Sequence, residues 1–97
     1  MVTLDTLRGD KRQDILRIAG EHGARNLRVF GSVARGDASS ASDLDLLVEW
    51  DSGRSLLDHS RLVLELQSLL GTPVEIGTER SLHWYVRDKI LNEAVPL

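Results

Sequence analysis

The sequence predicts an α/β (α+β) fold in which helices pack on one small mixed β-sheet. Short runs rich in aliphatic residues, typical of strands, alternate along the chain with longer segments of helical periodicity. Turn residues separate these segments, and no linker or low-complexity stretch interrupts them. The chain has 97 residues, of which 41% are hydrophobic and 28% charged, which is enough for one compact core. We therefore expect a single domain over residues 1–97.

The first predicted helix covers residues 10–22, DKRQDILRIAGEH. Its isoleucine, leucine and alanine side chains recur at the spacing that builds one apolar face. Asp10 can cap the amino-terminal end of this helix, and Gly23 follows it as a stop signal. Residues 26–30, NLRVF, then predict a short strand.

Small polar residues separate this strand from the next. Residues 32–36, SVARG, predict one helical turn, and residues 38–42, ASSAS, predict a loop by composition. Residues 43–50, DLDLLVEW, predict the second strand, because aliphatic residues fill it and the turn sequence DSGRS follows it.

The second half of the chain predicts two helices around a third strand. Residues 56–70 form an amphipathic pattern that ends at a Gly-Thr-Pro turn. Residues 74–76, VEI, predict a short strand, and residues 81–94 predict the last helix with Ser81 as its cap. The apolar face of that last helix is expected to consist of Leu82, Tyr85, Val86, Ile90 and Leu91.

Composition excludes several classes of function. There are no cysteines, which excludes disulfides, thiolate zinc sites and a cysteine nucleophile. The net charge of −3 argues against an extensive nucleic-acid footprint. No apolar run approaches the roughly 20 residues of a membrane span. The amino-terminal stretch lacks the hydrophobic centre of an export signal, so we expect a cytoplasmic protein without a membrane partner.

Two aspartates at the start of the second strand carry the first functional signal. Aspartate is a poor strand former, yet Asp43 and Asp45 stand one residue apart. Side chains alternate along a strand, so both carboxylates are expected on one face, with Cα atoms roughly 6.6–7 Å apart. Like charges at this separation repel, and a hard cation such as Mg²⁺ would remove the repulsion. Glu75, in the third strand, is the natural third carboxylate, since Val74 and Ile76 flank it on the opposite face.

The segment just before these aspartates suits phosphates. A Gly31-Ser32 pair between a strand and a helical turn lets backbone N–H groups approach an anionic ligand closely. The Ser32 hydroxyl adds a donor, and Arg35 adds a cation one turn later. Because Gly31 lies at a strand end, we expect Gly31→Val to block phosphate approach and leave the fold mostly intact. Together the two halves predict a site for a metal–nucleotide complex.

Each of these residues also has a purely structural interpretation. An Asp-x-Asp pair at a strand start can face solvent and cap a loop, and Glu75 can be an exposed strand residue. Arg35 can be a surface charge paired with Asp37. Ser42, which we include among the nucleotide-binding candidates, can instead shape the loop.

The spacing of these residues resembles a known family. Gly31-Ser32, ten residues, and then Asp43-x-Asp45 are similar to the signature of the DNA polymerase β-type nucleotidyltransferases. FGSVARGDASSASDLDLLVEW resembles the minimal nucleotidyltransferase (MNT) family more closely, and the leading HGARNLRVFGS and closing VRDKILNEAVPL fit as well. The resemblance covers nearly the whole chain and implies a polymerase β-like nucleotidyltransferase core.

The resemblance implies roles for the site residues. Asp43 and Asp45 would bind two Mg²⁺ ions that hold ATP, and Gly31 and Ser32 would cradle its triphosphate with Arg35. Glu75 would complete the site and activate the acceptor hydroxyl. This family usually has aspartate at that third position, so the longer glutamate is a departure that bears on turnover.

The resemblance also implies a partner. Beyond the predicted core the given chain shows no acceptor-binding domain, so we expect the acceptor to come from another chain. MNT proteins are commonly paired with a helical HEPN-family toxin, and can act as antitoxins by transferring AMP to a tyrosine of that toxin. Two alternatives remain. The chain can be a binding antitoxin that masks its HEPN partner without catalysis, or a small-molecule, antibiotic-type nucleotidyltransferase whose acceptor site is formed by a dimer.

Overall fold

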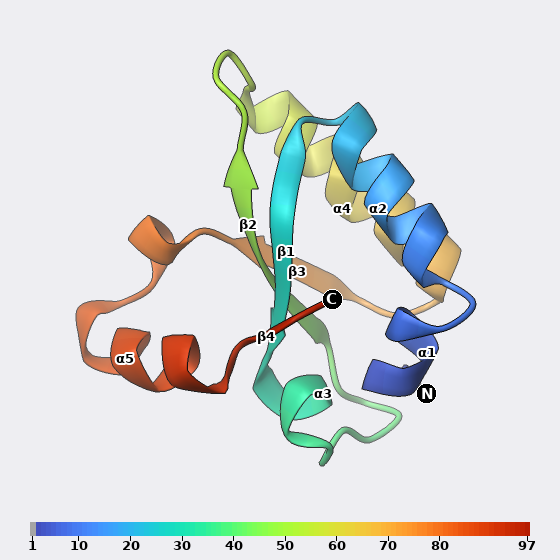
Figure 1. Ribbon diagram of the computed structural model, residues 1–97, viewed down its shortest axis with the longest axis vertical. Helices are drawn as coiled ribbons and strands as arrows, with labels where there is room; N and C mark the ends of the chain where they lie inside the picture. The colour runs from blue at the N-terminus through green and yellow to red at the C-terminus, as the bar shows by residue number, and fades with distance from the viewer. Residues whose placement is uncertain (1) are drawn as a thin grey trace.

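The computed structural model describes residues 2–97, and in that range five α-helices surround one four-stranded β-sheet (Figure 1). This arrangement confirms the predicted fold class. No helix among these residues is both long and apolar enough to cross a membrane. The elements follow in the order α1 (Leu4–Arg8), α2 (Arg12–Glu21), β1 (Ala24–Phe30), α3 (Gly31–Arg35), β2 (Leu44–Trp50), α4 (Leu56–Leu70), β3 (Val74–Gly77), a 3₁₀ turn (Glu79–Ser81), α5 (Trp84–Glu93) and β4 (Val95–Pro96).

The sheet is mixed, with the strand order β3-β2-β1-β4. β1 pairs antiparallel with β2 and with the short β4, whereas β3 pairs parallel with β2. The register places Asp45 of β2 beside Phe30 of β1 on one side and Glu75 of β3 on the other. Because paired residues share a face of the sheet, these three side chains lie on one face at the same level of three adjacent strands.

The main hydrophobic core lies between the sheet and the helices α2 and α4, which lie side by side on one face (Figure 1). Leu44, Leu46 and Val48 of β2 are buried in it, as strand alternation requires. Leu47 is also fully buried, on the opposite face and outside this cluster. Burial of one such side chain contributes about 1.5–3 kcal/mol. β2 is therefore held from both faces, and Asp45 is held with it.

Helix α4 matches the predicted range of residues 56–70. Its amino-terminal end carries a capping box, in which the Ser55 hydroxyl accepts from the first turn and the Asp58 carboxylate accepts the Ser55 N–H at 3.0 Å. Gly71 ends the helix in a left-handed conformation with φ 67°. The Gly71 stop is a local signal and was predicted, whereas the Ser55 capping box was not predicted.

Other predicted boundaries are wrong. α2 begins at Arg12, and Lys11 rather than Asp10 occupies the cap position, without a side-chain hydrogen bond. The last helix begins at Trp84, because Ser81 forms a capping box with Thr78 that closes the preceding 3₁₀ turn. α1 and β4 were not predicted at all, since each is too short to show a period.

α5 packs differently from the other long helices. It has no fully buried side chain, and it contacts α3 and β1. Tyr85, predicted on its apolar face, is 67% exposed, and Trp84 is 82% exposed. Figure 1 shows α5 on the side of the sheet away from α2 and α4. The helix therefore covers the face on which Asp45 lies.

Candidate active site

The turn between β1 and α3 brings a backbone loop against the carboxylate of Asp45. Gly31 adopts a left-handed conformation with φ 74°, which strongly favours glycine. A Cβ atom at this position would collide with Oδ2 of Asp45, so the missing side chain is what lets the carboxylate lie against the turn. Our expectation that Gly31→Val leaves the fold mostly intact is therefore wrong, because the position has neither the space nor the backbone conformation for a side chain.

The three predicted carboxylates come together from two strands. Asp43 precedes the first residue of β2, Asp45 is half-buried in β2, and Glu75 is the exposed neighbour of Asp45 in β3. Burial raises the pKa of Asp45 to about 6, assisted by the charge and hydrogen bond of Glu75 and the charge of Asp43, and opposed by Arg35. The cluster thus concentrates negative charge at the carboxylate nearest to Gly31.

The donor chemistry of this cluster fits a hard cation. Carboxylate oxygens are the ligands that Mg²⁺ prefers, and a cation would offset both the burial and the carboxylate repulsion that raise the pKa of Asp45. Among residues 2–97, no three histidine, aspartate or glutamate side chains form a ready-made metal site. Asp45 and Glu75 therefore lie side by side at one level of the sheet, with Asp43 just before β2, and the three do not form a closed set of ligands.

A pocket of about 390 Å³ adjoins the turn and brings the predicted phosphate-binding residues together with Asp45, whereas Asp43 and Glu75 do not line it. Gly31, Ser32, Arg35 and Asp45 line one side of it. α5 lines the other side, with Val86 and Ile90 as apolar walls and with Lys89 and Glu93 as charged groups. The pocket thus has hydrogen-bond donors, two cations and two carboxylates within one cavity.

Lys89 and Glu93 are site residues that the sequence analysis missed. The sequence of residues 81–94 predicts only a helix with an apolar face. A signal was present, because Val86, Ile90 and Glu93 recur at helical spacing and so place a carboxylate in line with apolar side chains. A charged residue on an apolar stripe is unusual unless it has a partner.

Glu93 has two such partners, both in the Gly31–Arg35 segment. Its Oε1 atom accepts the backbone N–H of Gly31 at 2.9 Å and a hydrogen bond from Nη1 of Arg35 at 3.3 Å. Arg35 also donates through Nε to Asp37 at 3.3 Å. The predicted Arg35–Asp37 pair is therefore present, and it coexists with a place for Arg35 in the pocket.

Ser42 lies outside this pocket. Its hydroxyl accepts the N–H of Ser39 at 2.9 Å, and its carbonyl accepts the Thr72 hydroxyl at 3.3 Å. These contacts shape the loop before β2 and tie it to the turn before β3. The loop-shaping interpretation describes what Ser42 contacts, and its role in nucleotide binding stays a prediction.

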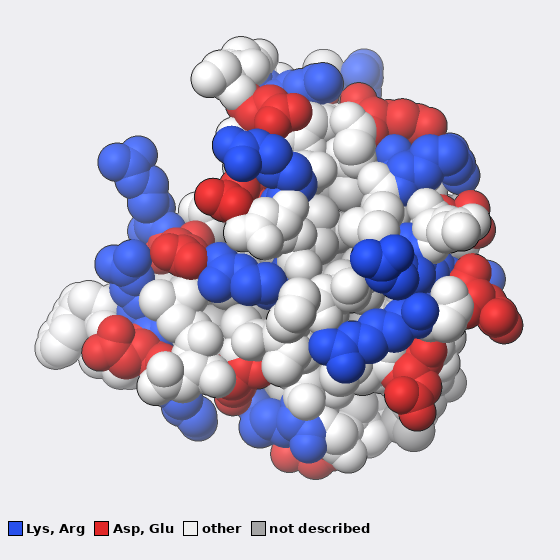
Figure 2. Space-filling view, in the orientation of Figure 1, with Lys and Arg blue, Asp and Glu red and all other residues white. Residues whose placement is uncertain are grey.

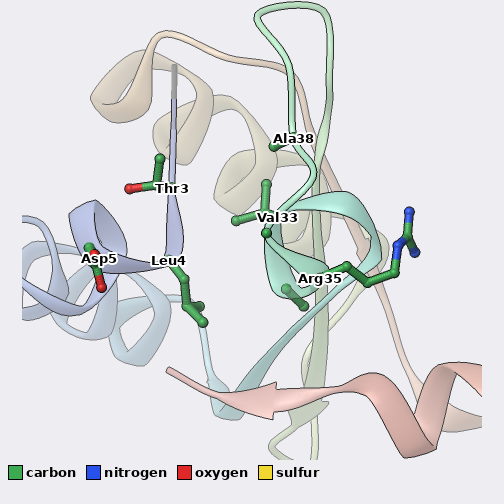
Figure 3. Close-up of a pocket in the computed structure, with 8 residues that line it drawn as sticks. Thr3, Leu4, Asp5, Val33, Arg35 and Ala38 are labelled. Atoms are coloured by element: carbon green, nitrogen blue, oxygen red, sulfur yellow. The ribbon is translucent and has the colours of Figure 1, made fainter.

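A second hollow, of about 270 Å³, lies on the other side of α3. Figure 3 shows Thr3, Leu4 and Asp5 around it together with Val33 and Ala38 of the α3 region. The guanidinium of Arg35 points away from Thr3, Leu4 and Asp5 in this view. None of the three predicted carboxylates lines this hollow, so it does not join the candidate site.

Charge on the face of the molecule seen in Figure 2 is mixed. Lysine and arginine side chains alternate there with aspartate and glutamate, without a continuous basic field. The expectation that extensive nucleic-acid binding is absent stays a prediction.

The raised pKa of Asp45 predicts that the free energy of unfolding depends on pH. The folded-state pKa is about 6, against 3.8 for the ordinary group, so the folded chain binds more protons between these values. Stability contributed by this group therefore falls as the pH rises from about 4 to 6. We expect Asp45→Asn to be more stable than the wild type at pH 7.5, by about 1 kcal/mol after discounting for partial exposure. The gain should disappear near pH 4, measured by urea unfolding.

The exposed Asp10 supplies a control for that measurement. Asp10→Asn removes the same charge far from the carboxylate cluster and should leave stability at pH 7.5 unchanged. Equal stability of the wild type and Asp45→Asn at both pH values would show that the charge of Asp45 does not lower the free energy of unfolding.

Comparisons with known proteins point to one family. The family model described as "Nucleotidyltransferase domain" matches residues 12–97. A relative in Methanocaldococcus jannaschii, named as a "putative protein adenylyltransferase", is 44% identical over 84 residues, covering 87% of this chain and 90% of its own. The protein adenylyltransferase MntA of Thermococcus cleftensis is 33% identical over 95 residues, covering 98% of this chain and 96% of its own.

Solved structures show the same fold. The "structure of putative minimal nucleotidyltransferase" superposes with a TM-score of 0.84 at 52% identity, covering 99% of this chain and 97% of its own. A chain of a toxin–antitoxin crystal structure with AMP-PNP superposes with a TM-score of 0.71 at 19% identity, covering 87% of this chain and 69% of its own. At that lower identity the likeness concerns the fold alone.

Proposed function

This chain belongs to the nucleotidyltransferase domain family, and on that premise we propose that it transfers AMP from ATP to a tyrosine hydroxyl of a HEPN-family toxin and thereby acts as its antitoxin. The observation that carries the proposal is the contact between the Gly31 turn and Asp45. Donors suited to phosphate and the Asp45 carboxylate, a candidate cation ligand, line one cavity, and Glu75 lies beside Asp45 on the neighbouring strand. Relatives named as protein adenylyltransferases support the reaction, and the antitoxin role draws support from the shared fold of the toxin–antitoxin chain.

The triphosphate would lie along the donors of the turn. Within residues 2–97 the hydroxyl of Ser32 is not engaged by another side chain, and Lys89 makes no ion pair. Arg35 lies between them and faces the same pocket. These groups would bind and orient the anion by charge-assisted hydrogen bonds, which are about twice as strong as neutral ones.

The carboxylates would hold Mg²⁺. Asp43, Asp45 and Glu75 supply oxygen ligands, and the ion, when bound, neutralises phosphate charge as nucleotidyl transfer proceeds. Glu75 is exposed, whereas its strand neighbour Asp45 is half-buried, so Glu75 is open to solvent, where an acceptor would arrive. It would take the proton of the tyrosine hydroxyl as the new oxygen–phosphorus bond forms at the α-phosphate and the bond to the β-phosphate breaks, releasing diphosphate.

The partner would approach along α5. Trp84 and Tyr85 are exposed on this helix, and the same helix lines the pocket through Val86, Lys89 and Glu93. Large exposed aromatic side chains are enriched in protein interfaces. If a toxin bound to α5, its acceptor tyrosine would lie close to the opening of the pocket.

A second candidate function is a binding antitoxin without catalysis. It is favoured by glutamate at the third carboxylate position, where the resemblance implies an aspartate. In that case the chain would neutralise its partner by covering it, and the carboxylates would contribute nothing to protection.

Incubation with labelled ATP, MgCl₂ and the protein encoded beside this chain tests the proposal. We expect mass spectrometry to find AMP on a tyrosine of the partner, and EDTA to abolish both the transfer and ATP binding, because phosphate and carboxylate charges repel without a cation. CaCl₂ added after EDTA is the control, because Ca²⁺ has the same charge as Mg²⁺ but prefers a different coordination geometry.

Two results would contradict the proposal. ATP that binds equally well in excess EDTA would remove the cation assignment. A partner that is bound and neutralised, yet carries no AMP under any divalent metal, would replace the transferase with the binding antitoxin.

A further inference from the structure

One carboxylate holds together the two predicted phosphate-binding groups. Glu93 accepts the Gly31 backbone N–H at 2.9 Å and pairs with Nη1 of Arg35 at 3.3 Å. The side chain of Arg35 is 45% exposed, whereas that of Glu93 is 16% exposed, so the contact with the Gly31 N–H lies in a partly dehydrated setting. Hydrogen bonds to charged groups in such settings contribute more than exposed pairs do. Glu93 therefore restrains the backbone of the turn and the guanidinium of Arg35 at once.

The contacts of Arg35 leave one edge of its guanidinium for a ligand. Nε donates to Asp37, and Nη1 donates to Glu93. Among residues 2–97 no hydrogen bond uses Nη2. Two carboxylates thus orient the plane of the guanidinium while one nitrogen stays open, which is the arrangement that a preorganised anion contact requires.

The same carboxylate ties α5 to the site. α5 has no fully buried side chain, and its packing partners are α3 and β1. Glu93 is its last residue, and only Ala94 separates it from β4, which pairs with β1. A charged tether at this point fixes the end of a lightly packed helix to the turn that β1 leads into.

We infer that Glu93 is a positioning residue for nucleotide binding, acting through Gly31 and Arg35. This inference deepens the proposed function and rests on it, since it assigns a residue that prepares the proposed phosphate site. Glu93 does not itself bind the phosphates. Instead it keeps the turn and the open nitrogen of Arg35 in place before ATP arrives, so that less freedom is lost on binding.

ATP binding by three variants tests this role, with MgCl₂ present and calorimetry as the readout. We expect Glu93→Ala to raise the Kd by about tenfold or more, the scale of a lost charge-assisted contact. Glu93→Gln keeps an oxygen for the Gly31 N–H but loses the charge that pairs with Arg35, and should fall between Glu93→Ala and the wild type. Asp88→Asn removes a charge from the same helix outside the pocket and should leave the Kd within about twofold.

Two further readouts separate positioning from loss of stability. The amide resonance of Gly31 in NMR spectra should move in Glu93→Ala and stay in place in Asp88→Asn. In an Arg35→Ala background, Glu93→Ala should lower the ATP affinity clearly less than it does in the wild type. The reason is that Arg35, one of the two groups that Glu93 positions, is already absent. A general loss of stability would lower affinity by the same factor in both backgrounds.

The outcomes decide between this inference and the proposed function. A wild type that binds no ATP overturns the proposed function, and the inference with it. A wild type that binds ATP while Glu93→Ala binds equally well overturns the positioning role alone. Tighter binding by Glu93→Ala or Glu93→Gln would also overturn it, since Glu93 would then compete with phosphate for Gly31 and Arg35. A Gly31 resonance that stays in place in Glu93→Ala would show that the tether does not hold in solution.

Discussion

Asp45→Asn is expected to reduce transfer of AMP to the partner by at least about 10²–10³-fold, the scale measured when one preorganised electrostatic group is removed from an active site. The variant keeps the shape of the side chain and deletes its charge. Asp45 is the predicted carboxylate that lines the pocket and contacts the Gly31 turn, so its charge acts where phosphate would lie. Leu44 and Leu46, on the opposite face, keep the strand in the core.

The same variant should fold and bind its partner normally. A pull-down with the partner and a thermal unfolding curve check these two points, and labelled ATP checks the transfer. Glu75→Gln should lose transfer in the same way if Glu75 takes the acceptor proton. Glu49→Gln, which changes an exposed carboxylate farther along β2, is the matched control and should transfer AMP at the wild-type rate.

Protection in cells distinguishes the catalytic from the masking mechanism. If Asp45→Asn and Glu75→Gln neutralise a toxic partner as well as the wild type does, transfer is not the basis of protection. The masking function would then replace the transferase as the account of this chain.

Gly31→Val is expected to lower both stability and ATP affinity. A residue with a Cβ atom in the left-handed region costs about 1–2 kcal/mol, and β-branching adds to the strain. The new side chain must also displace the carboxylate of Asp45. We expect an unfolding free energy lower by at least about 2 kcal/mol, and a melting temperature lower by about 10 °C. ATP binding should fall below detection at temperatures where the variant remains folded.

The variant Gly36→Val separates the effect of backbone strain from the effect of a steric clash with Asp45. Gly36 has φ 81°, similar to Gly31, and a Cβ atom there meets no atom within 4 Å. This control carries the backbone strain without moving Asp45, so it should lose stability and keep its ATP affinity. Equal ATP affinity in Gly31→Val and Gly36→Val would show that the close approach of Gly31 to Asp45 has no part in nucleotide binding.

The sequence by itself determined the features that rest on local signals. Residues 56–70 could be assigned because the apolar period lies within the segment and the Gly71 stop follows it directly. Strand alternation put Asp45 on the face opposite Leu44 and Leu46, and the structure buries those two leucines accordingly. The spacing of Gly31-Ser32 and the two aspartates indicated a nucleotidyltransferase, which the family match confirms.

Only the tertiary structure decided which residues meet. The pairing of Asp45 with Glu75 depends on the parallel register of β2 and β3, which no single segment encodes. The contact of Glu93 with Gly31 joins residues 62 positions apart. Lys89 enters the pocket because α5 packs across the end of β1. Such contacts follow from how elements pack in space, whereas periods and caps follow from neighbours along the chain. For that reason the carboxylates and the glycine turn were predictable, and the α5 wall of the pocket was not.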